Sequence, residues 1–177
     1  MFTQTPTLAS KNLCYSGFTM KIKILPLVLS VGVCFLAAGI GSVFTTSAID
    51  TWYVTLQKPF FNPPNWVFGP AWTLLYLLMG ISLYFVWVAK EDKKAKRQAF
   101  IFFFTQLTLN ALWSILFFGL KSPSLAFGGI ILLWIAIFIT IRIFLQISKV
   151  AGWLLVPYLA WVSFATILNL SIFLLNR

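Results

Sequence analysis

The sequence predicts an all-α membrane protein, a bundle of five transmembrane helices with up-down topology. The first observation is composition: of 177 residues, 60% are hydrophobic and only 9% are charged, against about 25% charged in an average soluble domain. The second is five apolar runs, each long enough to cross about 30 Å of hydrocarbon at 1.5 Å per residue. The third is that three of the four connections are short, which makes successive helices antiparallel neighbours.

The five runs are predicted to be helices because backbone groups in lipid must be hydrogen-bonded within the chain. They lie at about 24–45, 66–89, 98–120, 124–145 and 152–175, with a long loop at 46–65. Ser122 and Pro123 fit an N-cap and first helical position for the fourth run. Together, residues 24–177 are expected to form one membrane domain.

Residues 1–23 form a polar leader, expected either to be disordered or to lie upstream of the true start at Met20. Lys21 and Lys23 before an apolar stretch resemble the start of a signal peptide. The apolar run continues to about Thr45, however, beyond the 7–15 residues of a typical signal-peptide core. We therefore predict that this segment is kept as the first membrane helix.

The net charge of +10 does not indicate nucleic-acid binding, because the basic residues stand at the ends of apolar runs rather than along one face. The basic residues on the amino-terminal side are Lys11, Lys21, Lys23, Lys90, Lys93, Lys94, Lys96, Arg97, Arg142 and Lys149, against Lys58, Lys121 and Arg177 on the other. The positive-inside rule then predicts a cytoplasmic N-terminus and a C-terminus outside, in a bacterial cell membrane.

The residue types needed for a metal site or for acid–base catalysis are scarce. The chain has no histidine, and its carboxylates, Asp50, Glu91 and Asp92, lie outside the predicted spans, so neither a metal site nor a buried acid–base pair is expected. Cys14 and Cys34 give no disulfide framework. No cofactor is predicted.

One stretch, "WYVTLQKPFFNPPNWVFGPAWTLLY" at 52–76, gathers prolines and aromatic residues around Lys58. Proline lacks a backbone donor and restricts the residue before it, so the loop is expected to be a stiff lid. Its aromatic residues fit a membrane-interface belt equally well. Lys58 is either a solvated lysine or a partner for a ligand carboxylate.

Two predicted helices carry aromatic and amide side chains at helical spacing. The residues are Trp153, Pro157, Trp161, Ala165 and Asn169 on the last helix, and Gln106, Asn110, Trp113 or Ser114, and Phe117 on the third. Amides within a bilayer face the bundle interior, where they bridge helices or contact a ligand, and bridging is the commoner use. Under the lid, these stripes describe a pocket for a flat, apolar ligand with a polar edge.

The first helix carries "AAGIGS" at 37–42. Ala37 with Gly41, and Ala38 with Ser42, are small residues four apart, a pattern that allows close helix contact. A homodimer face, contact within the chain and exposure to lipid remain alternatives.

Three segments resemble the TspO/MBR family of translocator proteins, peripheral-type benzodiazepine receptors and bacterial tryptophan-rich sensory proteins. They are "WYVTLQKPFFNPPNWVFGPAWTLLYLLMG" (52–80), "QLTLNALWSILFF" (106–118) and "WLLVPYLAWVSFATILNL" (153–170). The resemblance covers about residues 24–175. It implies a five-helix bundle, often dimeric, that binds porphyrins such as protoporphyrin IX, sterols and synthetic ligands beneath the loop between helices 1 and 2.

Carried over by motif position, the resemblance implies a set of ligand-binding residues: Tyr53, Pro63, Trp72, Asn110, Trp113, Trp161 and Ala165. In some bacterial members, tryptophans matching Trp72 and Trp161 are implicated in light- and oxygen-dependent porphyrin breakdown, which makes these two the catalytic candidates. Some bacterial members are placed in the outer membrane, and eukaryotic members in the mitochondrial outer membrane.

The sequence also departs from the family pattern. Phe60-Phe61 stands where many members have tryptophan, which should alter the lid more than the cavity. Leu170 and Ser171 replace tyrosines of the animal sterol motif, and Arg177 is displaced toward the terminus, so tight sterol binding is not expected.

Three functions remain open: ligand binding with a regulatory or transport role, porphyrin degradation, and export of small hydrophobic metabolites. Active export is disfavoured because no Asp, Glu or His lies in a predicted span.

Overall fold

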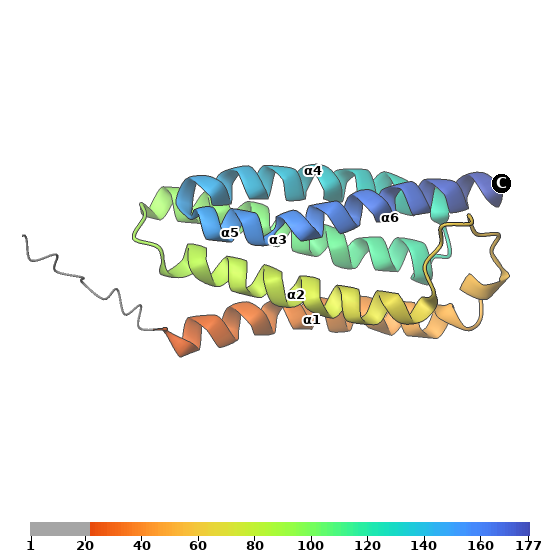
Figure 1. The fold of residues 1–177 in the computed structure, drawn as a ribbon, viewed down its shortest axis with the longest axis horizontal. Helices are drawn as coiled ribbons and strands as arrows, with labels where there is room; N and C mark the ends of the chain where they lie inside the picture. Colours follow the sequence, from red (N-terminus) through yellow and green to blue (C-terminus); the bar gives the residue numbers. More distant parts are fainter. Residues whose placement is uncertain (1–21) are drawn as a thin grey trace, which may run out of the picture.

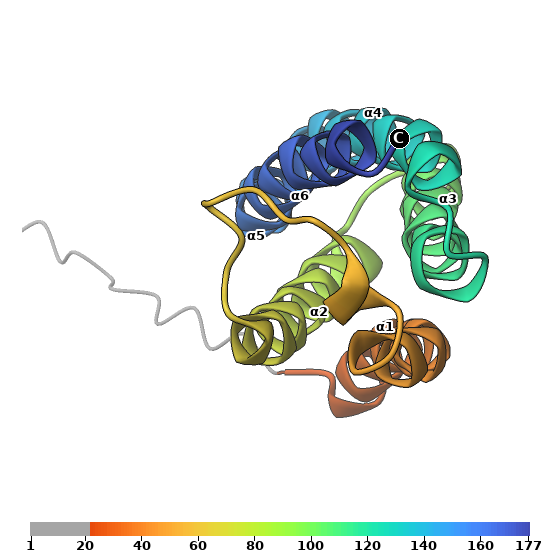
Figure 2. The same cartoon turned by 90° about the vertical axis from the view of Figure 1, so that its right-hand side faces the viewer.

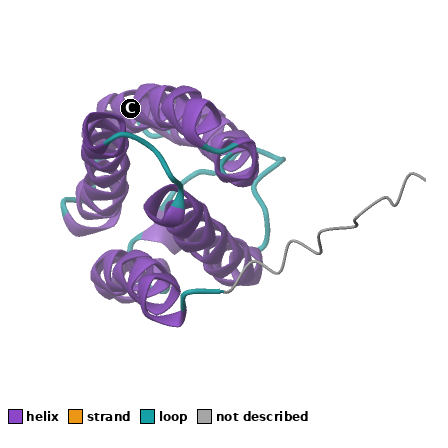
Figure 3. Ribbon diagram, turned by 90° about the vertical axis from the view of Figure 1, so that its left-hand side faces the viewer, coloured by secondary structure: helices purple, strands orange, loops and turns teal. Residues whose placement is uncertain are grey.

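The computed structural model describes residues 22–177, and the expectations for the leader and for a start at Met20 fall on residues outside this range. Five spans are present, as predicted (Figure 1). Their helices are α1 (Ile24–Ile49), α2 (Asn65–Val88), α3 (Lys93–Ser114), which continues as the π-helical η2 (Ile115–Gly119), α4 (Pro123–Ile147), α5 (Lys149–Leu154) and α6 (Val156–Leu175). Within this range the chain is helical, with no strand (Figure 3).

The helix ends follow local chemistry. Ser122 caps α4 by accepting from the N–H of Leu125 at 3.4 Å, as its position before Pro123 predicts. The start of α3 is earlier than predicted because the Asp92 side chain caps it by accepting from the N–H of Lys94 at 3.1 Å.

The fifth span differs more from its prediction, because it is two helices that meet at Leu155 rather than one continuous run. Pro157 supplies no N–H to continue the ladder, so the helix breaks just before it. The N–H of Leu155 instead bonds the carbonyl of Gly152 at 3.2 Å.

The helices surround the core in the order α1, α2, α5 with α6, α4 and α3, seen end-on in Figure 2. Two contacts show the closeness of the packing. A Cβ on Gly80 would lie 2.6 Å from the Cα of Val31, so α2 touches the α1 backbone there. Phe103 of α3 stacks on Phe144 of α4 with ring centroids 5.8 Å apart. The short α2–α3 connection makes α2 and α3 antiparallel. However, α2 packs mainly on α1 and α5 rather than on α3.

At one position, a small residue of α1 allows close contact with another helix of the same chain. Gly41 is buried, and a Cβ there would lie 3.1 Å from Oγ of Ser114 on α3. A Cβ on Gly39, by contrast, would meet no other atom within 4 Å, and this residue lies on the exposed side of α1. The sequence motif "AAGIGS" therefore brings α1 close to α3, and the homodimer stays a prediction.

The two ends of the bundle differ in character. One end, at the left of Figure 1, holds the start of α1, the α2–α3 loop, the lysine-rich first turn of α3 and the α4–α5 turn. The other end holds the C-terminus and the long loop Asp50–Pro64, with its single short helix η1 (Tyr53–Thr55). The basic start of α3 and the aromatic loop thus lie at opposite ends of the spans.

Candidate functional site

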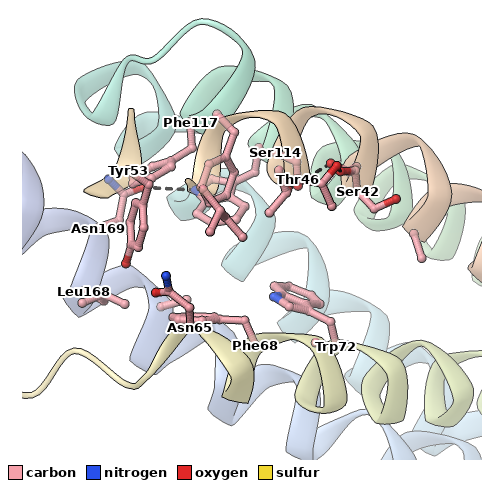
Figure 4. A pocket seen from close by; sticks show the side chains of 18 of the residues that line it. Ser42, Thr46, Tyr53, Asn65, Phe68, Trp72, Ser114, Phe117, Leu168 and Asn169 are labelled. Carbon is pink, nitrogen blue, oxygen red and sulfur yellow. Dashed lines mark hydrogen bonds between the residues drawn. The ribbon is translucent and has the colours of Figure 1, made fainter. Parts of the chain in front are cut away.

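A cavity of about 360 Å³ lies under the aromatic loop, between the halves of α1, α2, α3 and α6 nearest that end (Figure 4). Its volume falls in the usual range for small-molecule sites, about 300–1,000 Å³. The lining residues are Ala38, Gly41, Ser42, Thr45, Thr46, Ile49, Tyr53, Asn65, Trp66, Phe68, Gly69, Trp72, Tyr76, Trp113, Ser114, Phe117, Phe118, Trp161, Ala165, Leu168, Asn169 and Ile172.

Aromatic rings from α2 and α6 form one side of the cavity. Trp72 lies 5.7 Å from the ring of Tyr76, and Phe68 meets Trp161 edge-on at 6.1 Å. These spacings are those of favourable aromatic pairs. Because each ring is held by another, the indoles of Trp72 and Trp161 present fixed faces to the cavity.

A second part of the lining comes from α3 and α6, and an amide joins these two helices. Asn169 accepts from the indole Nε1–H of Trp113 at 3.1 Å and donates through Nδ2 to the carbonyl of Pro123 at 2.9 Å. Trp113 also stacks on Phe117 with centroids 5.4 Å apart. The polar atoms of Trp113 and Asn169 are thereby satisfied, and the surface left to the cavity is mostly apolar.

The π-helical turn η2 explains how Phe117 reaches the site. A π-helix widens the turn by one residue and is found frequently at functional sites. Here it leaves Phe117 only 2% exposed, in contact with Trp52 at 5.6 Å and Tyr53 at 6.3 Å. Phe117 therefore connects α3 to the loop above the cavity.

The loop covers this end of the cavity, and we call residues 50–64 the lid. Tyr53 is buried and donates its hydroxyl to Oδ1 of Asn62 at 2.8 Å, which ties the two halves of the lid together. Burial raises the pKa of Tyr53 to about 12, although the hydrogen bond to Asn62 acts in the opposite direction. Tyr53 is therefore neutral at physiological pH.

Lys58 belongs to the lid and is not among the lining residues. Its Nζ lies 4.7 Å from the centre of the Tyr53 ring and 3.4 Å from the carbonyl oxygen of Leu56. A cation over an aromatic face is an attractive contact. The structure thus gives Lys58 a role inside the lid that neither sequence interpretation included.

Two hydrogen bonds join the lid to the end of α6. Asn176 accepts from the backbone N–H of Gln57 at 2.9 Å and donates to the carbonyl of Gln57 at 2.9 Å. Farther along the lid, Phe61 meets Phe164 of α6 edge-on at 6.3 Å. These two contacts place the lid against one helix rather than free in solution.

The structure brings five of the seven predicted ligand-binding residues to the cavity: Tyr53, Trp72, Trp113, Trp161 and Ala165. Pro63 lies in the lid but not in the lining. Asn110 is buried behind the cavity, where Oδ1 accepts from Tyr76 and Nδ2 donates to Tyr158 at 2.8 Å. This is the bridging role that the sequence left open for an amide on α3.

Part of the predicted stripe on the last helix does not reach the site. Trp153 is 66% exposed and Pro157 is also exposed, whereas Trp161, Ala165 and Asn169 line the cavity. The prediction of one continuous stripe was wrong because a spacing of four residues exceeds the 3.6 residues of a helical turn, so side chains four apart shift by about 40° at each step around the helix.

Sequence reasoning missed the contribution of α1. Ser42, Thr45 and Thr46 line the cavity, and their hydroxyls bond carbonyls of their own helix, for example Thr45 to Gly41 at 3.0 Å. The run of small and hydroxyl residues at 37–48 is the signal that could have indicated this wall. No Asp, Glu, Lys or Arg is among the lining residues that the structure describes, so the site offers aromatic faces and neutral polar groups.

Comparison with known proteins was consistent with these features. The model of the TspO/MBR family matches residues 30–175. "Tryptophan-rich protein TspO" of Archaeoglobus fulgidus is 51% identical over 158 residues, 88% of this chain and 99% of that protein. "Tryptophan-rich sensory protein" of Cereibacter sphaeroides is 41% identical over 80% of this chain and 89% of that protein. The human "Translocator protein" is 39% identical over 73% of this chain and 78% of that protein.

The fold and the cavity define an integral membrane protein with five spans and an aromatic-lined site near one end. The chain belongs to the TspO/MBR family, as the resemblance of its three motifs predicted.

Proposed function

We propose that this protein binds porphyrins of the protoporphyrin IX type, and related flat hydrophobic molecules, in the cavity beneath the lid. The observation that carries the proposal is that four indoles, those of Trp66, Trp72, Trp113 and Trp161, line one cavity. Flat aromatic surfaces favour offset stacking with a flat conjugated ligand.

The polar groups of the cavity suit the edge of such a ligand. Asn65 and Ser114 lie in the lining, and the rest is mainly aromatic and aliphatic. Such a site binds the apolar surface of a ligand, and no charged side chain orients the ligand in it. The names of relatives, "Tryptophan-rich sensory protein" and "Translocator protein", support a regulatory or transport role that follows binding.

The test is a titration with protoporphyrin IX in the dark, followed by porphyrin absorbance. Wild type is compared with Trp161→Ala, which removes a lining indole, and with Trp153→Ala, which removes an exposed indole outside the cavity. We expect saturable binding in wild type and Trp153→Ala, and a loss of affinity in Trp161→Ala. Absence of binding by folded wild type, or equal loss in both variants, would contradict the proposal.

A second candidate function is light- and oxygen-dependent degradation of the bound porphyrin. The observation that favours it is that the two candidate residues, Trp72 and Trp161, line the same cavity and are oxidisable. Molecular oxygen is the oxidant, and the porphyrin absorbs the light. Illumination of the complex with and without oxygen, with mass analysis of the products, separates this function from binding, which leaves the ligand unchanged.

Transport of small hydrophobic metabolites or sterols is the other alternative. The neutral lining argues against proton coupling, which needs an ionisable group in the membrane. Leu170 and Ser171 at the sterol-motif positions argue against tight sterol binding. We also propose a homodimer in a bacterial cell membrane, with the basic end of the bundle in the cytoplasm and the lid and C-terminus outside.

A further inference from the structure

A groove lies on an exposed face of α3, at the end of the bundle opposite the lid (Figure 1). These positions are three or four residues apart, so they form one stripe along the helix. The lining residues are Lys93, Lys96, Arg97, Phe100, Ile101 and Phe104. None of them lines the cavity beneath the lid. The groove is therefore a separate feature that the proposed function does not use.

The stripe passes from the headgroup level into the hydrocarbon of the membrane. The span Lys93–Gly119 has 27 residues, about 40 Å, whereas the hydrocarbon core is about 30 Å thick. With equal projection at both ends, the first turn of α3 lies among the headgroups. Ile101 and Phe104, which are 55% and 43% exposed, then lie roughly 7 and 12 Å inside the hydrocarbon. The cations of the groove thus face headgroups, and its apolar part faces acyl chains.

The charged part of the groove is held in place by contacts with the end of α2. The Lys96 Nζ donates to the carbonyl of Trp87 at 3.0 Å. The ring of Trp87 in turn meets Phe100 edge-on at 6.4 Å. One cation and one ring of the groove therefore have positions fixed by a second helix. Because an ammonium group has three N–H donors, Lys96 keeps two for another acceptor.

The groove lies in a segment with an excess of positive charge. Residues 90–97 contain five basic residues against two carboxylates, Glu91 and Asp92. The Asp92 side chain is directed to the backbone of α3, where it accepts from the N–H of Lys94 at 3.1 Å. No Asp or Glu is among the groove-lining residues that the structure describes. Three neighbouring cations of this kind favour an anionic oxygen group such as phosphate.

The two parts of the groove together select its occupant. A free anion would leave the aromatic part unused, and a soluble acidic protein could not reach Phe104 inside the hydrocarbon. A second copy of the chain using the same face would bring like charges together, which opposes association. A phosphate joined to acyl chains matches both the charge and the apolar surface.

We propose that this groove binds one anionic phospholipid from the leaflet at the basic end of the bundle. The phosphate lies beside the three cations, and one acyl chain lies along Phe100, Ile101 and Phe104. Because Lys96 is bonded to Trp87, the bound lipid joins the start of α3 to the end of α2 and stabilises the folded chain. The site is remote from the cavity, so the proposal does not depend on porphyrin binding.

The preference for an anionic headgroup is tested by native mass spectrometry of the full chain in detergent. Phosphatidylglycerol is compared with phosphatidylcholine of identical acyl chains, and we expect several-fold greater retention of phosphatidylglycerol. Lys96→Gln with Arg97→Gln should abolish this preference. Lys90→Gln with Lys94→Gln removes two exposed charges of the same segment outside the groove and should preserve it. Equal retention of the two lipids, or equal loss in both double variants, would overturn the proposal in favour of a general attraction between charges.

The role of the acyl chain is tested by the melting temperature in detergent. Phosphatidylglycerol should raise this temperature by several degrees, whereas glycerophosphoglycerol, the same headgroup without acyl chains, and inorganic phosphate should not. Phe104→Ser should reduce the shift. Leu112→Ser, at an exposed leucine of the same helix outside the groove, should leave it unchanged. An equal shift from either soluble anion would indicate a site for a free anion, and equal effects of the two serine variants would exclude the acyl-chain contact. Either result would overturn the proposal even if porphyrin binds.

Discussion

The indole Nε1–H of Trp113 donates to Oδ1 of Asn169 across 3.1 Å, and this bond joins α3 to α6 at the cavity wall. Asn169 also donates to the carbonyl of Pro123 at the start of α4. One amide thus holds three helices around the site. The bond also explains why Asn169 contributes more to the shape of the cavity than to its polarity.

Replacing this amide should affect stability and binding together. Asn169→Leu leaves the indole N–H and the Pro123 carbonyl without partners, at a cost of about 1–3 kcal/mol for a buried polar group. We expect a lower melting temperature by circular dichroism and weaker porphyrin binding. The matched control is Ser171→Ala on the same helix, whose hydroxyl bonds only the Ile167 carbonyl and which should change neither quantity. An unchanged melting temperature in Asn169→Leu would argue against a shared clamp.

Asn110 is hydrogen-bonded to Tyr76 and Tyr158 in the buried core. A variant at Asn110 can show whether this amide bridges helices or contacts the ligand. Asn110→Ala removes the acceptor of Tyr76 and the donor to Tyr158, so the free energy of unfolding should fall by about 1–3 kcal/mol. Porphyrin affinity should change less than in Trp161→Ala, because Asn110 does not line the cavity. The reverse pattern, stable protein with lost affinity, would show direct contact with the ligand.

The contact of α2 with α1 depends on the absence of a side chain at Gly80. Gly80→Ala places a Cβ 2.6 Å from the Val31 Cα, a backbone atom that cannot move away alone. Overpacking of this kind costs about 1–3 kcal/mol, and thermal unfolding should reveal it. Gly32→Ala is the control on the facing helix, because nothing lies within 4 Å of its Cβ, and helix propensity alone should make it neutral or slightly stabilising.

The lid should loosen at high pH through Tyr53. Its pKa is raised to about 12 in the folded chain, above the ordinary value near 10, so the neutral form is favoured in the closed lid. The lid contact is fully present below about pH 10 and is lost as the pH rises toward 12. Fluorescence of a dye on Thr55→Cys should report this opening. Tyr53→Phe should abolish the pH dependence, and a transition that persists in this variant would assign it to another group.

The turn after η2 contains a strained residue. Lys121 has φ of 52°, in the left-handed region that glycine adopts more easily than other residues. Lys121→Gly should therefore stabilise the protein by about 1 kcal/mol without changing porphyrin affinity. Lys121→Ala, which removes the charge but keeps the Cβ, is the control. Equal stabilisation by both variants would point to charge rather than backbone strain.

The class of protein, the number of spans and the composition of the site follow from the sequence alone. Span prediction works because the free energy of placing a segment in lipid depends on its own length and side chains. The start marked by Ser122 and Pro123 was also readable, since caps act within one turn, whereas the Asp92 cap that begins α3 was missed. Family resemblance pointed to five residues that the structure brings to one cavity.

How those residues are used depends on the packing of the helices. The sequence could not tell whether Asn110 bridges helices or contacts a ligand, because that depends on the rotation of α3 against Tyr76 and Tyr158. Nor could it show that Trp153 and Pro157 are exposed whereas Trp161, Ala165 and Asn169 line the cavity. Relative height and rotation of helices depend on contacts between distant segments, such as Gly80 on Val31, and no local pattern encodes them.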